Sequence, residues 1–263
     1  MSEKVNVTRV DDGVARVQMD DPGQQNQLSD ELVDGLLDRL RDLAEDTSIR
    51  AVILAGREDV FCGGGTLELL QRVSSGDLRA RDVLLPAKLV EFPVPIIAAV
   101  EGHAVGAGLA VALYCDIVVA SEGARYGANF TSMGFTPGLG VTSLLPALVG
   151  HGFASEMMMT AKFYKGAELA RRGLFTHVVA AREVLPLATD LARRIAERPR
   201  HVLTMLKADL AIPRRRALVE ATSREHLMHE LCFSRPEARA LIDAAYIGPR
   251  PEPPARTPGD AGQ

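Results

Sequence analysis

The chain has 263 residues, a formal net charge of −4 and 47% hydrophobic residues. This length and apolar content suit one large domain with a substantial core, and they exclude a disordered chain. The acidic balance argues against a general nucleic-acid binder. No stretch approaches the ~18 uninterrupted apolar residues of a membrane span, and the first residues lack a basic start followed by an apolar run. We therefore expect a cytoplasmic protein with no membrane and no nucleic-acid partner.

The cysteines give no sign of metal binding or of a disulfide framework. Cys62, Cys115 and Cys232 form an odd, widely spaced set without a CxxC pair or a histidine at ligand spacing. No spacing in the chain is typical of a nicotinamide, flavin or metal site. We therefore expect a protein that works without a cofactor.

Apolar strands and helical segments alternate through the first half of the chain. Val14–Met19 alternates like a half-buried strand, and Ser29 is placed to cap an amphipathic helix. Further strands are predicted at Ala51–Leu54, Ile96–Val100 and Asp116–Ala120. The pattern predicts an α/β protein with a parallel, layered core.

The segment between the second and third of these strands is less regular. Helical spacing over Leu67–Glu91 is interrupted by Ser74–Asp77, which reads SSGD. The interruption lies soon after a glycine-rich loop, so we predict that Val73–Pro86 is a mobile segment.

After about residue 150 the strand signals largely stop and helical patterns take over. The expected helices are Gly166–Arg172, Glu183–Glu197, Val202–Ala211, Arg215–Cys232 and Pro236–Ala245. Residues 248–263 contain five prolines and few apolar side chains, too few to offset the entropy lost on ordering. We therefore divide the chain into a core at 1–195, a helical region at 196–247 and a disordered tail at 248–263.

A glycine-rich turn in the segment Gly102–Asp116, GHAVGAGLAVALYCD, joins a buried strand to an apolar helix. Gly106 and Gly108 flank Ala107, so no bulky side chain keeps a ligand from the first helical turn, whose N–H groups lack intrahelical partners. The spacing fits neither GxxxxGK[ST] nor GxGxxG, so a nucleotide phosphate site is not indicated. Taken alone, close packing of the helix on the sheet explains these glycines equally well.

A second glycine-rich loop decides between these two explanations. Asp59–Thr66, DVFCGGGT, follows the strand Ala51–Leu54 and again places bare backbone beyond a strand end. Two N–H donors from separate loops, here those of Gly65 and Ala107, are what an oxyanion hole requires. We therefore predict that these two N–H groups stabilise an oxygen that gains negative charge during a reaction.

With both loops, the chain resembles the crotonase (enoyl-CoA hydratase/isomerase) superfamily. Its two signature regions read FCGGGTLELL and AAVEGHAVGAGLAVALYCDIVVAS, and the likeness covers roughly residues 5–245. The resemblance implies a crotonase spiral of ββα repeats in the core, followed by an α-helical C-terminal trimerisation region. It also implies an acyl thioester of coenzyme A or of a carrier protein's phosphopantetheine as substrate, and a homotrimer or a dimer of trimers.

The residues that the resemblance assigns to water addition are missing. Family hydratases use two glutamates, and the matching positions here are Ala110 and Phe130. Neither side chain transfers a proton, so hydration would lose a general base and a general acid, each contributing ~10²–10⁴-fold in rate. Hydratase activity is therefore not expected.

The surroundings instead resemble the decarboxylases of polyketide β-branching, which act on a 3-methylglutaconyl group carried by an acyl carrier protein. The matching strings are YGANF at 126–130, MGFTPG at 133–138, YKGAELARRG at 164–173 and EHLMHELCF at 225–233. The resemblance implies loss of CO₂ to a 3-methylcrotonyl-type product, through a dienolate held in the oxyanion hole. An apolar pocket would add to the rate by disfavouring the carboxylate of the ground state.

The resemblance assigns the return of a proton to His229, because histidine is the side chain that titrates near neutrality. On the residues alone, a histidine that meets a neighbour or solvent on an amphipathic C-terminal helix is the alternative. His226 lies three positions earlier on the same helix face and competes for the role. His103 is expected to orient a donor loop rather than to react.

The related decarboxylases carry a lysine for the substrate carboxylate after the first donor loop, but no lysine occupies Leu67–Pro86 here. Arg79 and Arg81 are the cations available, with Arg72 closer to the donor loop and Lys88 beyond Pro86. An arginine binds a carboxylate bidentately but is a poor proton donor. Alternatively, these arginines belong to a solvated loop face. Asn129 and Tyr126 complete the predicted substrate-binding set, with a turn cap as the alternative role of Asn129.

Other functions remain open on the sequence. One is an enoyl isomerase or another enolate-stabilising crotonase that uses coenzyme A, and another is an inactive scaffold that binds a carrier protein or is recruited to RNA. Two arginine groups, Arg214–Arg216 and those at 193, 194, 198 and 200, are either solvated helix faces or a docking surface for an acidic carrier. The two intact glycine loops favour an enzyme.

Overall fold

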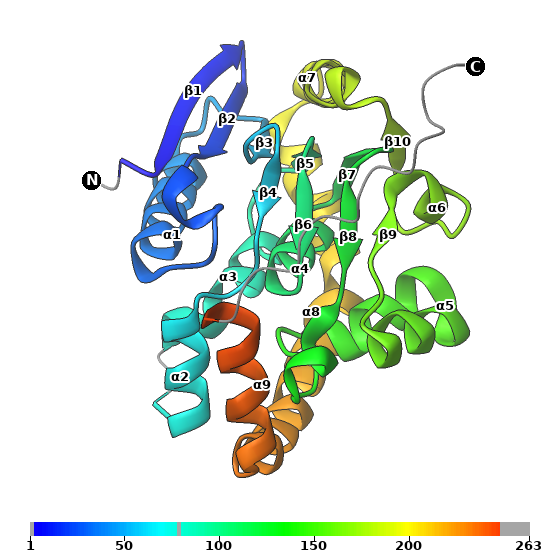
Figure 1. Cartoon of the computed structure of the whole chain (residues 1–263). Helices are drawn as coiled ribbons and strands as arrows, with labels where there is room; N and C mark the ends of the chain where they lie inside the picture. The colour runs from blue at the N-terminus through cyan, green and yellow to red at the C-terminus, as the bar shows by residue number, and fades with distance from the viewer. Residues whose placement is uncertain (1–2, 78–79, 248–263) are drawn as a thin grey trace, which may run out of the picture.

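The computed structural model describes residues 3–77 and 80–247, with the backbone alone for 80–83 and 247. Two β-sheets lie beside each other, with helices packed around them (Figure 1). In order, the larger sheet contains β1 (Val5–Asp11), β2 (Val14–Met19), β3 (Ala51–Ala55), β5 (Ile96–Val100), β7 (Ile117–Ser121) and β10 (His177–Val179). The smaller sheet contains β4 (Val60–Cys62), β6 (His103–Val105), β8 (Arg125–Gly127) and β9 (Tyr164–Lys165). The four strands predicted from the sequence are confirmed, with ends that differ by at most one residue.

The chain alternates between the two sheets, and this alternation is the predicted ββα spiral. β3, β5 and β7 pair in parallel in the larger sheet, and each is followed by a strand of the smaller sheet, β4, β6 or β8. Helices then lead to the next repeat: α2 (Leu67–Ser75) and α3 (Ala80–Val90), α4 (Ala107–Leu113), and η2 (Asn129–Met133) with α5 (Val141–Thr160). The expected fold class is confirmed.

The central strands of the larger sheet, β3, β5 and β7, are buried on both faces, which explains their nearly unbroken apolar sequences. Alternate residues of one strand face opposite sides, so Ile53 and Ile97 pack with α7 (Ala181–Ala196), while Leu54 and Ile96 belong to the main core. That main core also contains the apolar sides of α3, α4 and α1 (Asp30–Glu45). The predicted cap of α1 is confirmed, since the Ser29 side chain accepts a hydrogen bond from the Leu32 N–H at 3.2 Å.

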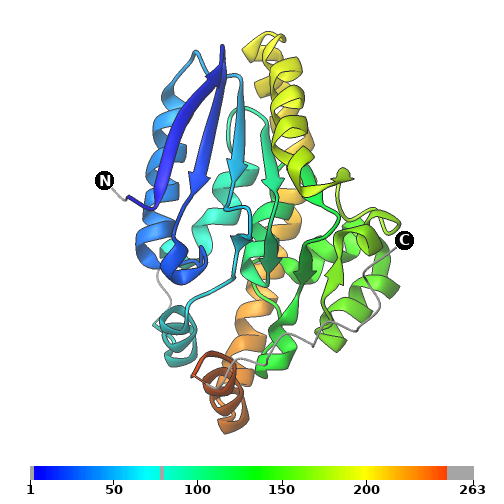
Figure 2. The same ribbon diagram turned by 45° about the horizontal axis from the view of Figure 1, so that its top comes forward.

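The longest helix, α8 (Arg200–Phe233), corrects the prediction of two separate helices around Pro213. Both sides of the proline are tied to the core. Lys207 donates hydrogen bonds to the Leu89 and Val94 carbonyls and to Asp116, and Arg214 donates to the Leu113 and Cys115 carbonyls. These tertiary contacts compensate for the hydrogen bond that the proline removes. In Figure 2 α8, in yellow to orange, passes behind the strands, and α9 (Pro236–Ile247) follows it.

The expectation that strands stop near residue 150 is wrong. β9 pairs with β8 and β10 pairs with β7, so both extend existing sheets at an edge. They have two and three residues, too few to show an alternating pattern in the sequence. The short helix α6 (Gly166–Ala170) lies between them, and the one-turn helix η1 (Pro22–Gln24) precedes α1.

Two predictions about order fall on residues that the structure does not describe. Helix α2 ends at Gly76 in the left-handed conformation, as the SSGD interruption indicates, but residues 78–79 within the predicted mobile segment lie outside the described residues. The predicted tail, 248–263, also lies outside them. The division at residues 195 and 247 stays a prediction. Within residues 3–77 and 80–247, no helix combines the length and the apolar content needed to cross a membrane.

Candidate active site

The loops that build the candidate site follow neighbouring strands of the smaller sheet. β4 pairs in parallel with β6, and β6 with β8, so their carboxyl ends lie at one edge. Gly63–Thr66 follows β4, Gly106 and Ala107 follow β6, and Asn129 begins η2 just after β8. Ligands of open α/β sheets commonly bind beyond the carboxyl ends of the strands. The topology therefore brings both predicted donor loops to one place.

The two donor loops touch at Gly64. A Cβ atom placed on Gly64 would lie 3.0 Å from the Val105 carbonyl oxygen and 4.0 Å from the Ala107 nitrogen. Gly64 has a φ of +97° and Gly106 has a φ of +53°, both in the region that disfavours L side chains. The glycines therefore give each loop its turn and allow the loops to approach each other closely.

The N–H groups of Gly65 and Ala107 differ from those of their neighbours in the two loops. Neighbouring peptide groups are used in the fold, because the Leu28 N–H donates to the Gly64 carbonyl and the Gly106 N–H donates to a carbonyl of β8, each at 2.8 Å. Among the hydrogen bonds of the described residues, neither the Gly65 nor the Ala107 N–H donates to a protein acceptor. Ala107 is the first residue of α4, where an N–H has no partner within the helix.

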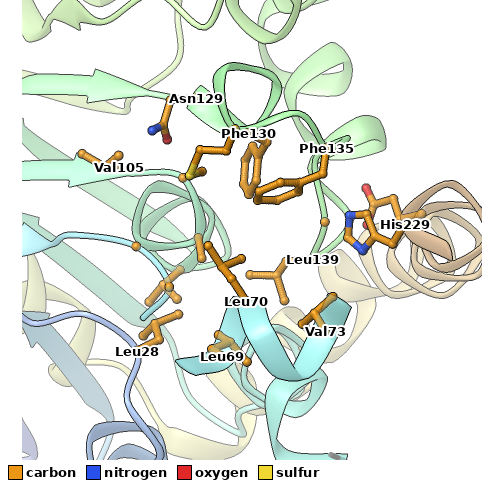
Figure 3. Close-up of a pocket in the computed structure, with 18 of the residues that line it drawn as sticks. Leu28, Leu69, Leu70, Val73, Val105, Asn129, Phe130, Phe135, Leu139 and His229 are labelled. Carbon is orange, nitrogen blue, oxygen red and sulfur yellow. The ribbon is translucent and has the colours of Figure 1, made fainter. Parts of the chain in front are cut away.

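A largely apolar pocket opens against these two N–H groups. Leu28 and Val105 lie at one end of it and His229 at the other, with apolar side chains of α2 and the 130–139 segment between them (Figure 3). The apolar lining consists of Leu28, Val33, Leu69, Leu70, Val73, Leu85, Pro86, Val105, Val111, Phe130, Met133, Phe135, Leu139 and Phe233. Polar side chains enter from Asn129, Thr222, Glu225, His226, His229 and Tyr246. Gly65, Ala107, Asn129 and His229, four of the predicted site residues, thus line one pocket, and their roles stay predictions.

His229 is held on several sides. Its Nε2 lies 2.8 Å from the Thr136 carbonyl oxygen, and because a carbonyl only accepts, Nε2 carries a proton. The ring meets Phe135 and Phe233 at centroid distances of 6.0 and 5.5 Å. Gly138 leaves room for it, since a Cβ there would lie 2.9 Å from the His229 Cε1. These contacts fix the ring at the end of the pocket.

Glu225 lies one helical turn before His229 and fixes the same loop. One carboxylate oxygen accepts from the Gly140 N–H at 2.6 Å, and the other accepts from the Thr142 N–H and hydroxyl at 3.0 and 2.7 Å. The side chain is buried, and it places a negative charge at the amino end of α5, where the helix dipole favours it. Both oxygens are already engaged, so Glu225 serves as an anchor of the loop.

The loop that Glu225 anchors has an unusual backbone. Leu139 has a φ of +59°, which is uncommon for a residue with a branched side chain. Its carbonyl accepts a hydrogen bond from the Tyr114 hydroxyl at 2.8 Å. Burial, followed by the charge of Glu225, raises the pKa of Tyr114, so that hydroxyl stays protonated as a donor. The side chains of Tyr114, Glu225 and His229 thus hold the loop between η2 and α5 against the pocket.

Tyr126 does not line the pocket, so the structure gives no support to the prediction that it binds substrate. Its side chain is fully buried, its hydroxyl donates to the Ser121 carbonyl at 3.0 Å, and its ring packs on Phe175 at a centroid distance of 4.6 Å. Burial raises the pKa of this hydroxyl. Tyr126 therefore belongs to the packing between the two sheets.

Asn129 lines the pocket beside the second donor turn. Its Oδ1 lies 3.3 Å from the position that a Cβ of Gly106 would take. This oxygen is buried and has no hydrogen-bond partner among the described residues. A buried amide with unused bonding capacity at this point suits contact with a polar group of a ligand.

The predicted carboxylate-binding cations cannot be placed. Arg79 and the side chain of Arg81 lie outside the described residues. Arg72, which is also on this segment, is buried and pairs with Asp30 at 2.7 Å and Glu68 at 3.2 Å, so it holds α2 in place. In the described part of the chain, no lysine or arginine lines the pocket.

Three other reactive side chains differ in their relation to the pocket. Cys62 is buried behind the first donor loop, and burial raises the pKa of its thiol to about 12, so it packs rather than reacts. His226 lines the pocket but is mostly exposed and lies 3.4 Å from Glu230. His103 accepts a hydrogen bond from the Arg125 N–H at 2.9 Å, joining β6 to β8. Among the described residues, no group of three histidine, cysteine or acidic side chains could hold a metal ion.

The arginine groups are largely used within the fold. Arg193 pairs with Asp11 at 2.5 Å and Arg194 with Asp190 at 2.8 Å. Arg200 donates to the Ile49 and Ala44 carbonyls at 2.9 and 3.2 Å. These contacts favour structural roles for most of these arginines over a docking surface.

Sequence reasoning missed three polar residues of the pocket, Thr222, Glu225 and Tyr246. The Tyr246 hydroxyl donates to the Gly65 carbonyl at 2.7 Å, across 181 positions of the chain. Glu225 is the first residue of the EHLMHELCF string, and Tyr246 directly follows the region of family resemblance. The resemblance could therefore have drawn attention to both residues. Most of the hydrogen-bond partners of Glu225 and Tyr246 are backbone groups, which carry no sequence signal.

Comparisons with known proteins agree with this geometry. The family model for enoyl-CoA hydratase/isomerase matches residues 9–245. The bacillaene synthase decarboxylase PksI of Bacillus subtilis is 36% identical over 242 residues, which cover 92% of this chain and 97% of PksI.

Solved structures show the same relationship. A structure of a dehydratase/decarboxylase enzyme couple involved in polyketide β-branching has a TM-score of 0.89 and 35% identity, covering 94% of this chain and 97% of the other. The ECH2 decarboxylase domain of CurF from Lyngbya majuscula has a TM-score of 0.85 and 34% identity, covering 91% and 98%. The chain therefore belongs to the enoyl-CoA hydratase/isomerase family, the crotonase superfamily that its two glycine loops indicate.

Proposed function

We propose that the protein decarboxylates a glutaconyl-type acyl thioester, 3-methylglutaconyl on an acyl carrier protein, in polyketide β-branching. The observation that carries the proposal is a pocket with two unused N–H groups and an apolar side chain, Phe130, at a position where family hydratases carry an acid–base glutamate. The similarity to PksI and to the CurF domain, both decarboxylases, supports the same reaction. Neither Ala110 nor Phe130 can activate water, so hydration lacks its two proton-transfer groups.

The reaction begins with cleavage of the bond between the γ-carbon and its carboxylate. CO₂ leaves, and the electron pair of that bond moves through the carbon–carbon double bond to the thioester oxygen. The product of this step is a dienolate, whose negative oxygen accepts hydrogen bonds from the N–H groups of Gly65 and Ala107. Main-chain donors aimed at the site where charge develops typically contribute ~10²–10³-fold each.

One proton must then be added to the dienolate. We propose that His229 supplies it from Nδ1, because the Nε2 proton is held by the Thr136 carbonyl. Nδ1 takes this proton from solvent, so the net change is loss of CO₂ with uptake of one proton. Addition at the γ-carbon gives a 3-methylcrotonyl thioester, whereas addition at the α-carbon would give its β,γ-isomer. The hydrogen bond from Nε2 to Thr136 and the contacts with Phe135 and Phe233 support a fixed donor position and hence one product.

The apolar walls favour the first step. A carboxylate in such a pocket is poorly solvated, whereas the dienolate spreads its charge onto an oxygen that meets two donors. Asn129, with its unused buried oxygen and its amide N–H groups, is the side chain that we propose for a polar group of the substrate. Arg79 and Arg81 stay the predicted partners of the carboxylate.

The test uses the purified full chain with 3-methylglutaconyl loaded on an acyl carrier protein. We expect a product lighter by one CO₂, with a new hydrogen from solvent at one carbon, detected by intact-mass spectrometry in deuterated buffer. Parallel incubations with an enoyl thioester and with the coenzyme A form separate hydration, isomerisation and a coenzyme A preference. Hydration of the enoyl thioester without any loss of CO₂ would overturn the proposal.

We also propose that the chain works as a homotrimer or a dimer of trimers. Large apolar side chains stand exposed along α8, namely Met205, Leu206, Leu210, Val219, Leu227 and Leu231, each between 55% and 70% exposed. Apolar surface of this extent on one helix supports contact with another protein surface. Light scattering should give three or six times the mass of the chain, and a monomer would contradict it.

A further inference from the structure

The hydroxyl of Tyr246 reaches the first donor loop from the far end of the chain. It donates a hydrogen bond of 2.7 Å to the carbonyl oxygen of Gly65, whose own N–H is the first donor. Tyr246 also lines the pocket, and burial raises the pKa of its hydroxyl to about 12. The hydroxyl is therefore a protonated donor throughout the physiological range.

The peptide groups on both sides of Gly65 are held by hydrogen bonds. The group that contains its N–H also contains the Gly64 carbonyl, which accepts from the Leu28 N–H at 2.8 Å. In a trans peptide the N–H and the carbonyl point in opposite directions, so this bond aims the Gly65 N–H away from Leu28. The next group contains the Gly65 carbonyl, and Tyr246 holds that one.

Gly65 depends on such restraints more than another residue would. Glycine lacks a Cβ, so rotation about its φ and ψ meets little steric resistance, and the N–H of Gly65 keeps one direction only if the peptide groups on both sides are held. The following residue, Thr66, is fixed as the cap of α2 through a hydrogen bond from the Leu69 N–H at 3.1 Å. The hydrogen bond from Tyr246 restrains the Gly65 carbonyl, which lies between the restrained Gly64 carbonyl and the helix cap at Thr66.

The helix that carries Tyr246, α9, is packed against three other helices. α9 packs beside α2, as Figure 1 shows, and against η2 and α8. Ala238 and Ile242 of α9 are buried, and Gly134 admits the helix because a Cβ there would lie 2.9 Å from the Ala238 Cα. A hydroxyl on a helix held in this way is a firm support for the loop.

We propose that Tyr246 is a positioning residue, which keeps the N–H of Gly65 aimed at the thioester oxygen and so completes the oxyanion hole only when α9 is docked. The proposal rests on the proposed decarboxylation for its rate effect, and on the hydrogen bond to Gly65 for its geometry. Tyr246 touches the loop through its hydroxyl and takes no proton in the reaction.

The test compares Tyr246→Phe with wild type in the full chain, and uses Tyr164→Phe as the matched control. The Tyr164→Phe variant also loses a hydrogen bond from a tyrosine hydroxyl, here to the Glu156 carboxylate at 2.8 Å, but Tyr164 does not line the pocket. We expect Tyr246→Phe to lower kcat about tenfold, less than the ~10²–10³-fold effect of removing a donor itself, with KM changed by less than about twofold. Tyr164→Phe should keep the wild-type kcat.

A second readout does not depend on turnover. The carbonyl stretch of a ¹³C-labelled 3-methylcrotonyl thioester, measured by infrared difference spectroscopy, falls when the bound carbonyl is polarised by the two N–H donors. In Tyr246→Phe the carbonyl stretching frequency should fall less on binding than in wild type, whereas in Tyr164→Phe it should fall by the wild-type amount. If wild type polarises the carbonyl but releases no CO₂, the proposed function fails and the role of Tyr246 is still decided by this shift. A Tyr246→Phe protein with wild-type kcat and carbonyl frequency, or an equal loss in Tyr164→Phe, overturns the inference.

Discussion

On the side of the smaller sheet, the pocket presents peptide groups, whereas on the side of α8 and α9 it presents side chains. The first side consists of turns after β4 and β6, with Gly64 in van der Waals contact with the second turn. The second side contributes Glu225, His229 and Tyr246, from two helices that follow the spiral. The first side can hold charge but cannot move a proton, and the second can move a proton.

The two sides also differ in how they are held. The donor turns are fixed by parallel strand pairing and by glycines. Gly64 and Gly106 have a positive φ, which disfavours L side chains, and a Cβ on Gly108 would lie 2.3 Å from the Cys62 carbonyl oxygen. The helical side is fixed by side-chain hydrogen bonds, such as the one from His229 to the Thr136 carbonyl and those that Glu225 accepts. We therefore expect changes on the first side to abolish stabilisation of the oxyanion, and changes on the second to alter the proton step.

The largest effect is expected from removing a main-chain donor. Ala107→Pro replaces the N–H of the first residue of α4 with a ring carbon, at a helix position where proline is well tolerated. Gly106 before it has no side chain to clash with the ring. We predict a fall in kcat of ~10²–10³-fold, measured as CO₂ release from the 3-methylglutaconyl carrier.

Ala107→Gly is the control for this change. It retains the N–H and should keep kcat within about threefold of wild type, because only a methyl group on the pocket wall is lost. Circular dichroism should show both variants folded. If Ala107→Pro turned over at the wild-type rate, the second donor would have no part in the reaction.

A smaller effect is expected from the helical side. His229→Gln removes the proton donor and retains a side chain that can hydrogen-bond to the Thr136 carbonyl. We predict that product formation falls about 10²-fold, the lower end for loss of a general acid, because water can protonate a dienolate slowly. Deuterium should then appear at both the α- and γ-carbons, since the position of the donor no longer selects one.

His226→Gln provides the comparison on the same helix. His226 lines the pocket but is mostly exposed, so we predict less than a twofold change in rate and an unchanged site of deuteration. A larger loss of rate in His226→Gln than in His229→Gln would show that His226, and not His229, is the proton donor.

The same contrast explains what the sequence could predict. The donor turns are local in the chain, and glycines beside a strand and a helix form a recognisable pattern. The sequence therefore predicts Gly65 and Ala107 as donors from the same segments that predict the fold, and the structure places both residues at one pocket. Phe130 and Ala110 were also readable, because an apolar residue at an acid–base position excludes a reaction. His229 needed the family resemblance, since nothing in its own helix distinguishes it from His226.

The differences between the structure and the sequence-based predictions come from contacts that are distant in the chain. Tyr126 lies in a short strand and packs on Phe175, 49 positions later, a neighbour that could not be inferred from spacing. Helix α8 continues past Pro213 because Lys207 and Arg214 bind carbonyls about 90 to 120 positions earlier in the chain. Tertiary contacts override local preference in both cases.

The smallest effect that we predict lies where the helical side meets the loop between η2 and α5. Gly138→Ala adds a methyl group whose carbon would lie 2.9 Å from the His229 Cε1, closer than such contacts allow, so the ring must shift by a few tenths of an ångström. We predict about a tenfold loss of kcat with an unchanged KM, because misplacement of a catalytic group by a full ångström costs about 10²-fold. Gly152→Ala, where an added Cβ meets nothing within 4 Å, is the matched control and should behave as wild type.

The double variant Gly138→Ala/His229→Gln decides how the methyl group acts. If it acts only by displacing the imidazole, it should cost little once His229 is replaced, and the two effects should be strongly non-additive. Full additivity would instead mean that Gly138 supports the loop independently of His229, through the backbone that Glu225 and Tyr114 hold. Because the donor turns are untouched in all three proteins, the carbonyl stretch of the bound product should stay at its wild-type value. A change in that stretch would show that the two sides of the pocket are coupled through the loop, rather than acting in sequence on one dienolate.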